Sequence, residues 1–200
     1  MNGGVHKTAH QLIEQGKMKP MVLVMPSDGL HGDGSGYLKH QLEDYEKWIV
    51  EDVVTVVKEQ ISGVNEKSNF FITGLSMGGY GALRLGAKYP ELFRSFSGLS
   101  SITEFSQMAL FLEPGEYDRL NKLVLTQEDV LDCILANKER LPLFYFDCGR
   151  EDLLIEFNRK LHNRLLESNI PHTYVEHNGA HQWVYWQTHI AESLLFFNEF

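Results

Sequence analysis

The sequence contains little cysteine and fewer basic than acidic residues. Its two cysteines, Cys133 and Cys148, are too few for a disulfide framework and lack the CxxC or cysteine–histidine spacing of a zinc site. Lysine and arginine together number 18 against 27 acidic residues, which gives a formal net charge of -9, and no basic cluster occurs. We therefore expect two buried thiols and no nucleic-acid partner.

Long hydrophobic runs are also missing. No window approaches the roughly 18 apolar residues of a membrane span, and the first 19 residues lack the apolar run of a signal peptide. We therefore expect a cytoplasmic protein with no membrane partner, unless a further segment precedes residue 1. The 200 residues, 43% of them hydrophobic, are enough for one sizeable core, which predicts a single domain over residues 1–200.

Short apolar runs alternate with longer helical patterns along the chain. Strands are predicted at 21–25, 70–75, 95–99, 143–146 and 172–176, and helices at 48–57, 77–89, 153–168 and 183–200. Strands that alternate with helices of ten or more residues favour parallel βαβ units. The pattern therefore predicts an α/β protein with a parallel sheet covered on both faces.

A stretch of about forty residues, 102–140, separates the third and fourth predicted strands, whereas such connections usually have about two to six residues. Its second half has a helical pattern, with Thr126 as the predicted N-cap and Asp129 three positions later. The stretch is either a cap or insert near a functional site or a surface excursion.

A serine lies between glycines directly after the second predicted strand, in the segment FFITGLSMGGYGA. Gly74 to Gly78 match the G-x-S-x-G nucleophile elbow, in which a strand ends before the serine and a helix begins after it. Because the serine of such a turn has a strained backbone, the residues two positions before and after it, Gly74 and Gly78, must be small to avoid clashes. Met77 N–H at the helix start would donate to an oxyanion. The alternative is a glycine-rich turn that only packs.

A catalytic serine needs a histidine base and a carboxylate, and both are expected at later strand ends in the order Ser, acid, His. After the fourth predicted strand, Asp152 is the preferred acid, although it is also a candidate helix N-cap. Asp147 is favoured as a hydrogen-bonding residue and Glu151 as a solvated loop residue. His181 follows the fifth predicted strand and is the expected base, while a turn between His177 and His181 argues against a metal site.

Three segments together resemble one family. GLSMGGYGALRLGAKYPELF, DCGREDLL and GAHQWVYW are similar to the putative-esterase family of α/β-hydrolases, which includes esterase D, feruloyl esterases, tributyrin-type esterases and mycolyltransferases. The likeness extends over nearly the whole chain. It implies a three-layer sandwich with a mostly parallel sheet, Ser76 as nucleophile, Asp152 as acid, His181 as base, and no cofactor.

One part of the family pattern is missing. Family members begin with several strands and an H-G-G-like loop that completes the oxyanion hole, and residues 1–20 resemble the helix that follows that loop. The resemblance therefore implies a fold that is truncated at its N-terminus and lacks a strand between 21–25 and 70–75. The segment HGDGSG at 31–36 is either a stand-in for the missing loop or a surface loop.

The motifs together predict a serine carboxylesterase that forms an acyl-enzyme from small-molecule esters, and the resemblance implies small acyl or aromatic acyl groups. Two alternatives remain. The chain could be a weak or inert hydrolase-fold protein with a binding or assembly role, including a possible homo-oligomer. It could also be an acyltransferase that uses the same three residues.

Overall fold

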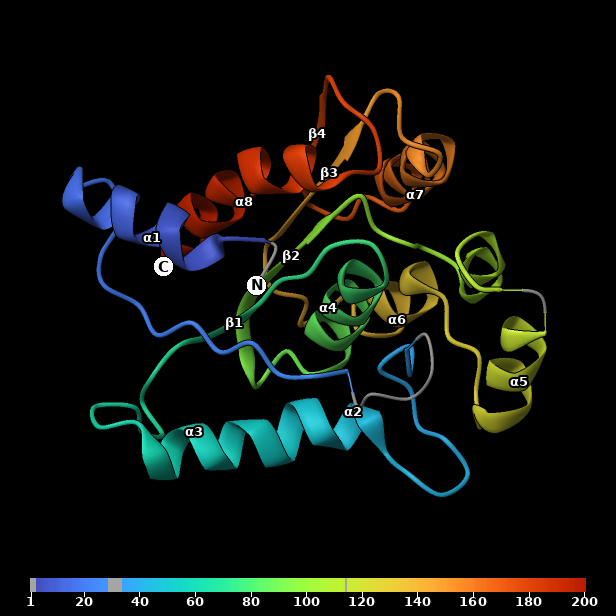
Figure 1. The fold of residues 1–200 in the computed structure, drawn as a ribbon, viewed down its shortest axis with the longest axis horizontal. Helices are drawn as coiled ribbons and strands as arrows, with labels where there is room; N and C mark the ends of the chain where they lie inside the picture. Colours follow the sequence, from blue (N-terminus) through green and yellow to red (C-terminus); the bar gives the residue numbers. More distant parts are fainter. Residues whose placement is uncertain (1–2, 29–33, 114) are drawn as a thin grey trace.

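The computed structural model describes residues 3–28, 34–113 and 115–200 (Figure 1). The strands are β1 (Phe70–Ile72), β2 (Phe93–Leu99), β3 (Phe144–Gly149) and β4 (Thr173–His177). The helices are α1 (Val5–Glu14), α2 (Tyr45–Lys47), α3 (Val54–Gln60), α4 (Met77–Lys88), α5 (Glu116–Leu123), α6 (Val130–Ala136), α7 (Ile155–Glu167) and α8 (Trp183–Phe197). A π-helix, η1 (Trp48–Val53), joins α2 to α3, and a 3-10 helix, η2 (Phe105–Leu110), follows β2.

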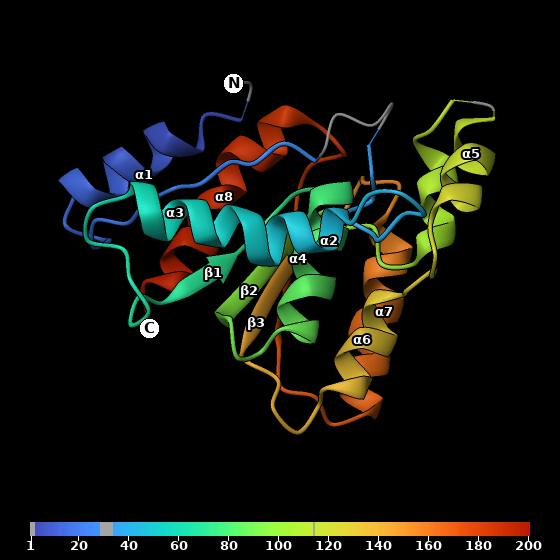
Figure 2. The same cartoon turned by 90° about the horizontal axis from the view of Figure 1, so that it is seen from below.

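The four strands form one parallel sheet in the order β1-β2-β3-β4. Helices α1 and α8 lie on one side of the sheet, and α3, α4 and α6 lie on the other (Figures 1 and 2). Strands covered on both faces carry nearly continuous apolar runs, and Phe96 of β2 stacks on its cross-strand partner Phe144 of β3 with ring centroids 4.7 Å apart. The predicted α/β fold with a parallel sheet is confirmed.

The predicted strand at 21–25 is wrong, because this segment has no regular structure and pairs with none of the described strands. Its side chains do alternate, since Met21 and Leu23 pack near the cluster around Leu12 while Val22 and Val24 are exposed. A strand also needs a hydrogen-bonded neighbour, and among the described strands β1 pairs with β2 alone. The other four predicted strands are present with shifted ends.

The stretch 102–140 contains η2, α5 and α6, and its apolar side chains enter the main core. Ile102, Phe105 and Ile134 belong to the same buried cluster as Phe96 of the sheet. The predicted N-cap Thr126 is wrong, because α6 begins at Val130 after Asp129. The Asp129 carboxylate accepts the N–H of Phe105 at 2.8 Å and so ties α6 to η2.

Both cysteines are buried free thiols, as expected, and burial raises the pKa of Cys133 to about 12. Across the residues that the structure describes, none of the helices combines the length and the apolar character that crossing a bilayer would require. Helix α1 packs against α8 through Ala9, Leu12 and Leu194, which brings segments from the two ends of the chain side by side (Figure 1).

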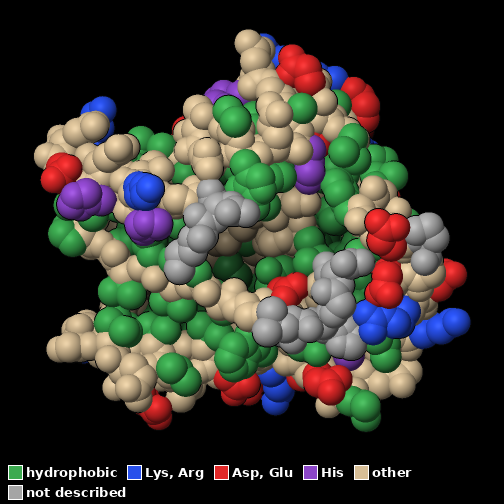
Figure 3. All heavy atoms as spheres, viewed as in Figure 1, with side chains coloured by type: hydrophobic (Ala, Val, Ile, Leu, Met, Phe, Trp, Pro, Cys, Tyr) green, Lys and Arg blue, Asp and Glu red, His purple; other side chains and the backbone are tan. Residues whose placement is uncertain are grey.

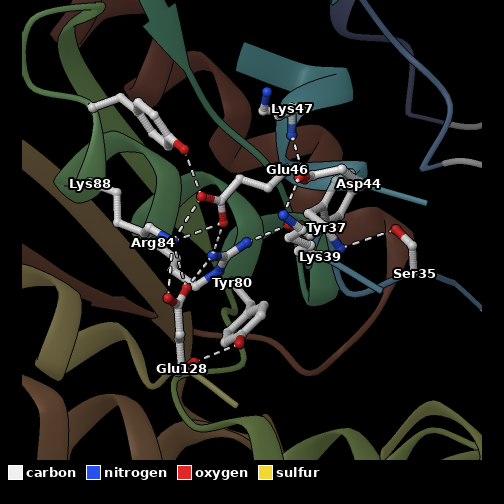
Figure 4. Close-up of polar contacts among 11 residues, drawn as sticks. Ser35, Tyr37, Lys39, Asp44, Glu46, Lys47, Tyr80, Arg84, Lys88 and Glu128 are labelled. Atoms are coloured by element: carbon white, nitrogen blue, oxygen red, sulfur yellow. Dashed lines mark hydrogen bonds and ion pairs between the residues drawn. The ribbon is translucent and has the colours of Figure 1, made fainter. Parts of the chain in front are cut away.

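A cluster of charges holds α4 in place beneath the sheet (Figure 4). The Arg84 side chain is fully buried and donates to Glu46 and to Glu128, each at 2.5 Å, and to the backbone carbonyl of Tyr37. Lys88 contacts the same two carboxylates. Burial alone would raise the pKa of Glu46, but the charge of Arg84 and the hydrogen bond from Lys88 outweigh it and lower that pKa. The cluster thus joins α4 to α2 and to the segment before α6.

Replacing Arg84 with methionine is expected to destabilise the protein by about 3 kcal/mol, because two poorly solvated carboxylates lose a buried partner. Arg140→Met is the matched control. Its partner Glu91 and Arg140 itself have side chains 67% and 62% exposed, so the expected loss is below about 1 kcal/mol. Urea unfolding followed by circular dichroism measures both, and equal losses would contradict the assigned role of Arg84.

Candidate active site

The turn from β1 into α4 has the geometry of a nucleophile elbow. Ser76 lies between the strand and the helix with φ 53° and ψ -117°, a backbone conformation that non-glycine residues rarely adopt. Ser76 N–H donates to Leu99 O at 2.9 Å, and Leu99 N–H donates to Gly74 O at 2.9 Å. These bonds fix the turn to the end of β2 and hold the serine at the edge of the sheet.

The two outer glycines of the elbow are not equivalent. A Cβ on Gly74 would lie 2.2 Å from the carbonyl oxygen of Gly78, so no side chain fits there. Among the described residues, a Cβ on Gly78 would meet only the Tyr37 hydroxyl at 3.8 Å, an ordinary contact. The expectation of a required small residue is therefore correct for Gly74 and wrong for Gly78. Beyond the elbow, a Cβ on Gly79 would lie 2.3 Å from Ser101 Oγ. Because glycine has no Cβ, α4 can lie close to the chain after β2.

The structure brings Ser76, His181 and Asp152 into one hydrogen-bonded line. His181 Nε2 lies 2.9 Å from Ser76 Oγ, and His181 Nδ1 lies 2.9 and 3.1 Å from the two carboxylate oxygens of Asp152. The Asp152 side chain is fully buried and that of His181 is 13% exposed. Asp152 also accepts the N–H of Leu154 at 2.8 Å, so one carboxylate orients the histidine and caps the turn before α7.

The loops that carry Asp152 and His181 are bound to each other. Arg150 N–H donates to His177 O at 2.8 Å, and Glu151 N–H donates to Gly179 O at 3.1 Å. The carboxylate of Glu151 in turn accepts the N–H of Gly179. Glu151 is an exposed loop residue, as predicted, and its hydrogen bonds to Gly179 also help to hold the acid next to the base.

Asp147 does not contact His181. It lies buried in β3, where its Oδ1 accepts a 2.6 Å hydrogen bond from the Tyr185 hydroxyl, in agreement with the predicted hydrogen-bonding role. Burial raises the pKa of Asp147 to about 7, although the hydrogen bond from Tyr185 acts in the opposite direction. Tyr185 lies close to Gly149, the last residue of β3, and to Gly179 in the loop after β4, so the Asp147–Tyr185 pair supports the loops that carry the acid and the base.

Aromatic side chains border the imidazole of His181. The rings of Phe111, from the 102–140 stretch, and Trp186, from α8, lie 4.8 and 4.9 Å from the His181 ring. Hydrophobic side chains also gather around the hollow in the middle of the face seen in Figure 3. Sequence reasoning missed Phe111, because nothing in its local pattern signals contact with a residue 70 positions away.

The segment 31–36 lies only partly within the described residues, and His31, Gly32 and Asp33 fall outside them. Gly34, Ser35 and Gly36 are buried, which contradicts a surface loop at these positions. Gly34 has φ 129°, and a Cβ there would lie 2.1 Å from the Met77 side chain. The end of this segment therefore packs against the residue that follows Ser76.

The family model described as "Putative esterase" matches residues 1–197. The chain belongs to this esterase family. It is thereby placed among the carboxylic ester hydrolases, as the motifs predicted.

Individual relatives agree with this placement. An acetyl esterase of Caldicellulosiruptor saccharolyticus is 28% identical to this esterase, over 92% of this chain and 74% of that protein. Two solved structures share its fold. A ferulic acid esterase has a TM-score of 0.80 at 19% identity, covering 99% of this chain and 78% of the other. The fluorophosphonate-binding serine hydrolase FphF of Staphylococcus aureus has a TM-score of 0.70 at 24% identity, covering 81% and 67%.

The elbow of this esterase predicts different responses to alanine at its two glycines. Gly74→Ala forces a Cβ into the backbone of Gly78 and is expected to cost about 2 kcal/mol or more. Gly78→Ala, within α4, is expected to leave stability unchanged or slightly raised, because alanine favours helix. Urea unfolding of both variants measures the two changes in stability. Equal destabilisation by Gly74→Ala and Gly78→Ala would contradict the predicted difference between the two glycines.

The buried Asp147 predicts a pH-dependent stability. As pH rises from about 4 to about 7, the unfolded chain releases this proton while the folded chain keeps it, so the folded state is progressively disfavoured. Asp147→Asn retains the acceptor for Tyr185 and removes the effect. The stability of the variant relative to wild type is therefore expected to rise over this range, by at most about 4 kcal/mol. Urea unfolding at several pH values measures the difference.

Asp118→Asn, which makes the same exchange at an exposed position, is the control for replacing a carboxyl with an amide. Parallel pH profiles for Asp147→Asn and wild type would contradict the buried-proton explanation.

Proposed function

We propose that this esterase is a serine carboxylesterase in which Ser76 is the nucleophile, His181 the general base and acid, and Asp152 the residue that orients His181. The continuous line of short hydrogen bonds from Ser76 through His181 to Asp152 carries the proposal. A serine hydroxyl attacks poorly at neutral pH unless a neighbouring base accepts its proton, and this arrangement supplies one.

In the proposed reaction, Ser76 Oγ attacks the ester carbonyl carbon while its proton moves to His181 Nε2. The tetrahedral intermediate collapses, the bond to the leaving alcohol breaks, and that alcohol takes the proton from His181. Water then attacks the acyl-enzyme, again with His181 as base, and releases the acid and free Ser76. Asp152 accepts a hydrogen bond from His181 Nδ1–H throughout and stabilises the imidazolium.

Met77 N–H is the proposed donor to the oxyanion. Met77 is the first residue of α4, so its N–H has no acceptor four residues earlier in the helix. The positive end of the helix dipole points to the same place, next to Ser76. An N–H held there before reaction would stabilise the negative oxygen that forms in each tetrahedral intermediate.

The proposed substrates are esters of small or aromatic acids. The rings of Phe111 and Trp186 beside His181 offer an apolar surface next to the reacting atoms. Two similar proteins are named for esters of such acids, one as an acetyl esterase and one as a ferulic acid esterase. Rates with p-nitrophenyl acetate and with ethyl ferulate would tell which acyl group this esterase prefers.

A fluorophosphonate probe tests the nucleophile. Wild-type protein is expected to be labelled at Ser76, and Ser76→Ala is expected to lose both labelling and at least about 10⁴-fold in kcat with p-nitrophenyl acetate. Asp152→Asn is expected to lower kcat by about 10⁴-fold, whereas Asp147→Asn, whose carboxyl does not reach His181, keeps kcat close to wild type.

Each variant is first checked for folding by circular dichroism. Folded wild-type protein that resists the probe would favour the inert hydrolase-fold alternative. Equal losses in Asp152→Asn and Asp147→Asn would overturn the assignment of the acid.

A further inference from the structure

A second cluster of titratable side chains lies behind the loop that carries His181. It consists of His177, the last residue of β4, together with His189 and Glu192 of α8. His177 Nε2 lies 2.9 Å from one Glu192 oxygen, and His189 Nδ1 lies 3.0 Å from the other. The three potential ligand atoms all lie within 4.8 Å of one another.

The surroundings of this cluster favour a cation. The Tyr145 hydroxyl donates a 2.8 Å hydrogen bond to Glu192 and orients its carboxylate, as hydrogen-bond partners of metal ligands commonly do. Among the described residues, no lysine or arginine forms an ion pair with Glu192. The carboxylate charge of Glu192 is therefore available to a metal cation.

Two imidazoles and one carboxylate form a ligand set that suits zinc and similar transition metals, whereas Mg²⁺ and Ca²⁺ prefer oxygen ligands. His189 and Glu192 are three residues apart on α8 and so share a helix face, and His177 meets them from the end of β4. We propose that His177, His189 and Glu192 form a site for one Zn²⁺ ion, with at least one coordination position left for water.

Binding at this site requires two local changes. The hydrogens that the two imidazoles share with Glu192 must leave the facing nitrogens, because a zinc ligand is a neutral imidazole nitrogen with a free lone pair. The rings of His177 and His189 stack with centroids 3.9 Å apart, so one of them must turn to point both lone pairs at a single ion. The Glu192 side chain is 37% exposed, which gives the ion a route from solvent.

The site is distinct from the proposed catalytic residues, since His181 is held by Asp152 and Ser76. A bound ion would connect the end of β4 directly to α8. The segment 178–182, which carries His181, joins β4 to α8. The ion would therefore cross-link the two elements that flank this loop.

Isothermal titration of metal-free protein that carries no histidine tag tests the proposal. Zn²⁺ is expected to bind with a stoichiometry of one, and Mg²⁺ is expected to give no binding heat. His177→Gln, His189→Gln and Glu192→Gln are each expected to weaken Zn²⁺ binding at least about tenfold. His162→Gln is the matched control, because His162 pairs with a different histidine, His172, at 2.7 Å.

Imidazole ¹H–¹⁵N spectra of the wild type identify the ligands even if a variant does not fold. Addition of one equivalent of Zn²⁺ is expected to shift the ring nitrogens of His177 and His189 and to leave those of His181 in place. The proposal is overturned by the absence of stoichiometric Zn²⁺ binding, by wild-type affinity in His189→Gln, or by shifts confined to His181.

Discussion

The turn between β1 and α4 is the constraint on which the rest of the site depends. Ser76 is held at positive φ by backbone hydrogen bonds to the end of β2 and by the helix that starts directly after it. The turn closes only because Gly74 leaves room for the backbone of Gly78. A side chain at Gly74 would push the start of α4 away from β1, and with it the hydroxyl that His181 reaches. The local backbone thus fixes the position of the Ser76 hydroxyl, which the loops carrying His181 and Asp152 must reach.

The charge cluster around Arg84 holds the same helix from its other end. Burying an arginine completely is unfavourable unless partners surround it, and here Glu46, Glu128 and the carbonyl of Tyr37 do so. These partners come from three separate segments of the chain. The helix that starts at Ser76 is therefore fixed to the segment before α6 and to α2 as well as to the sheet. Packing by glycine at one end and ion pairing further along leave α4 little freedom to move.

Sequence reasoning could propose the candidate site residues because their signals are short-range. Ser76, Asp152 and His181 each follow a strand, with a glycine two or three residues away, and parallel strands bring such loops to one edge. It failed where partners are distant. The contact of Phe111 with His181, the hydrogen bond from Tyr185 to Asp147 and the charges around Arg84 join residues dozens of positions apart, and no local period encodes them. The incorrectly predicted strand at 21–25 shows the same limit. Its side chains alternate as those of a strand would, but none of the described strands pairs with it.

The pairing of the β3–α7 and β4–α8 loops has a mechanical consequence. Hydrogen bonds between these loops hold the carboxylate and the imidazole to each other, while the hydroxyl is held separately by the turn before α4. A shift of α4 relative to the two loops would therefore change the distance between Ser76 and His181 and leave the pair of Asp152 with His181 intact.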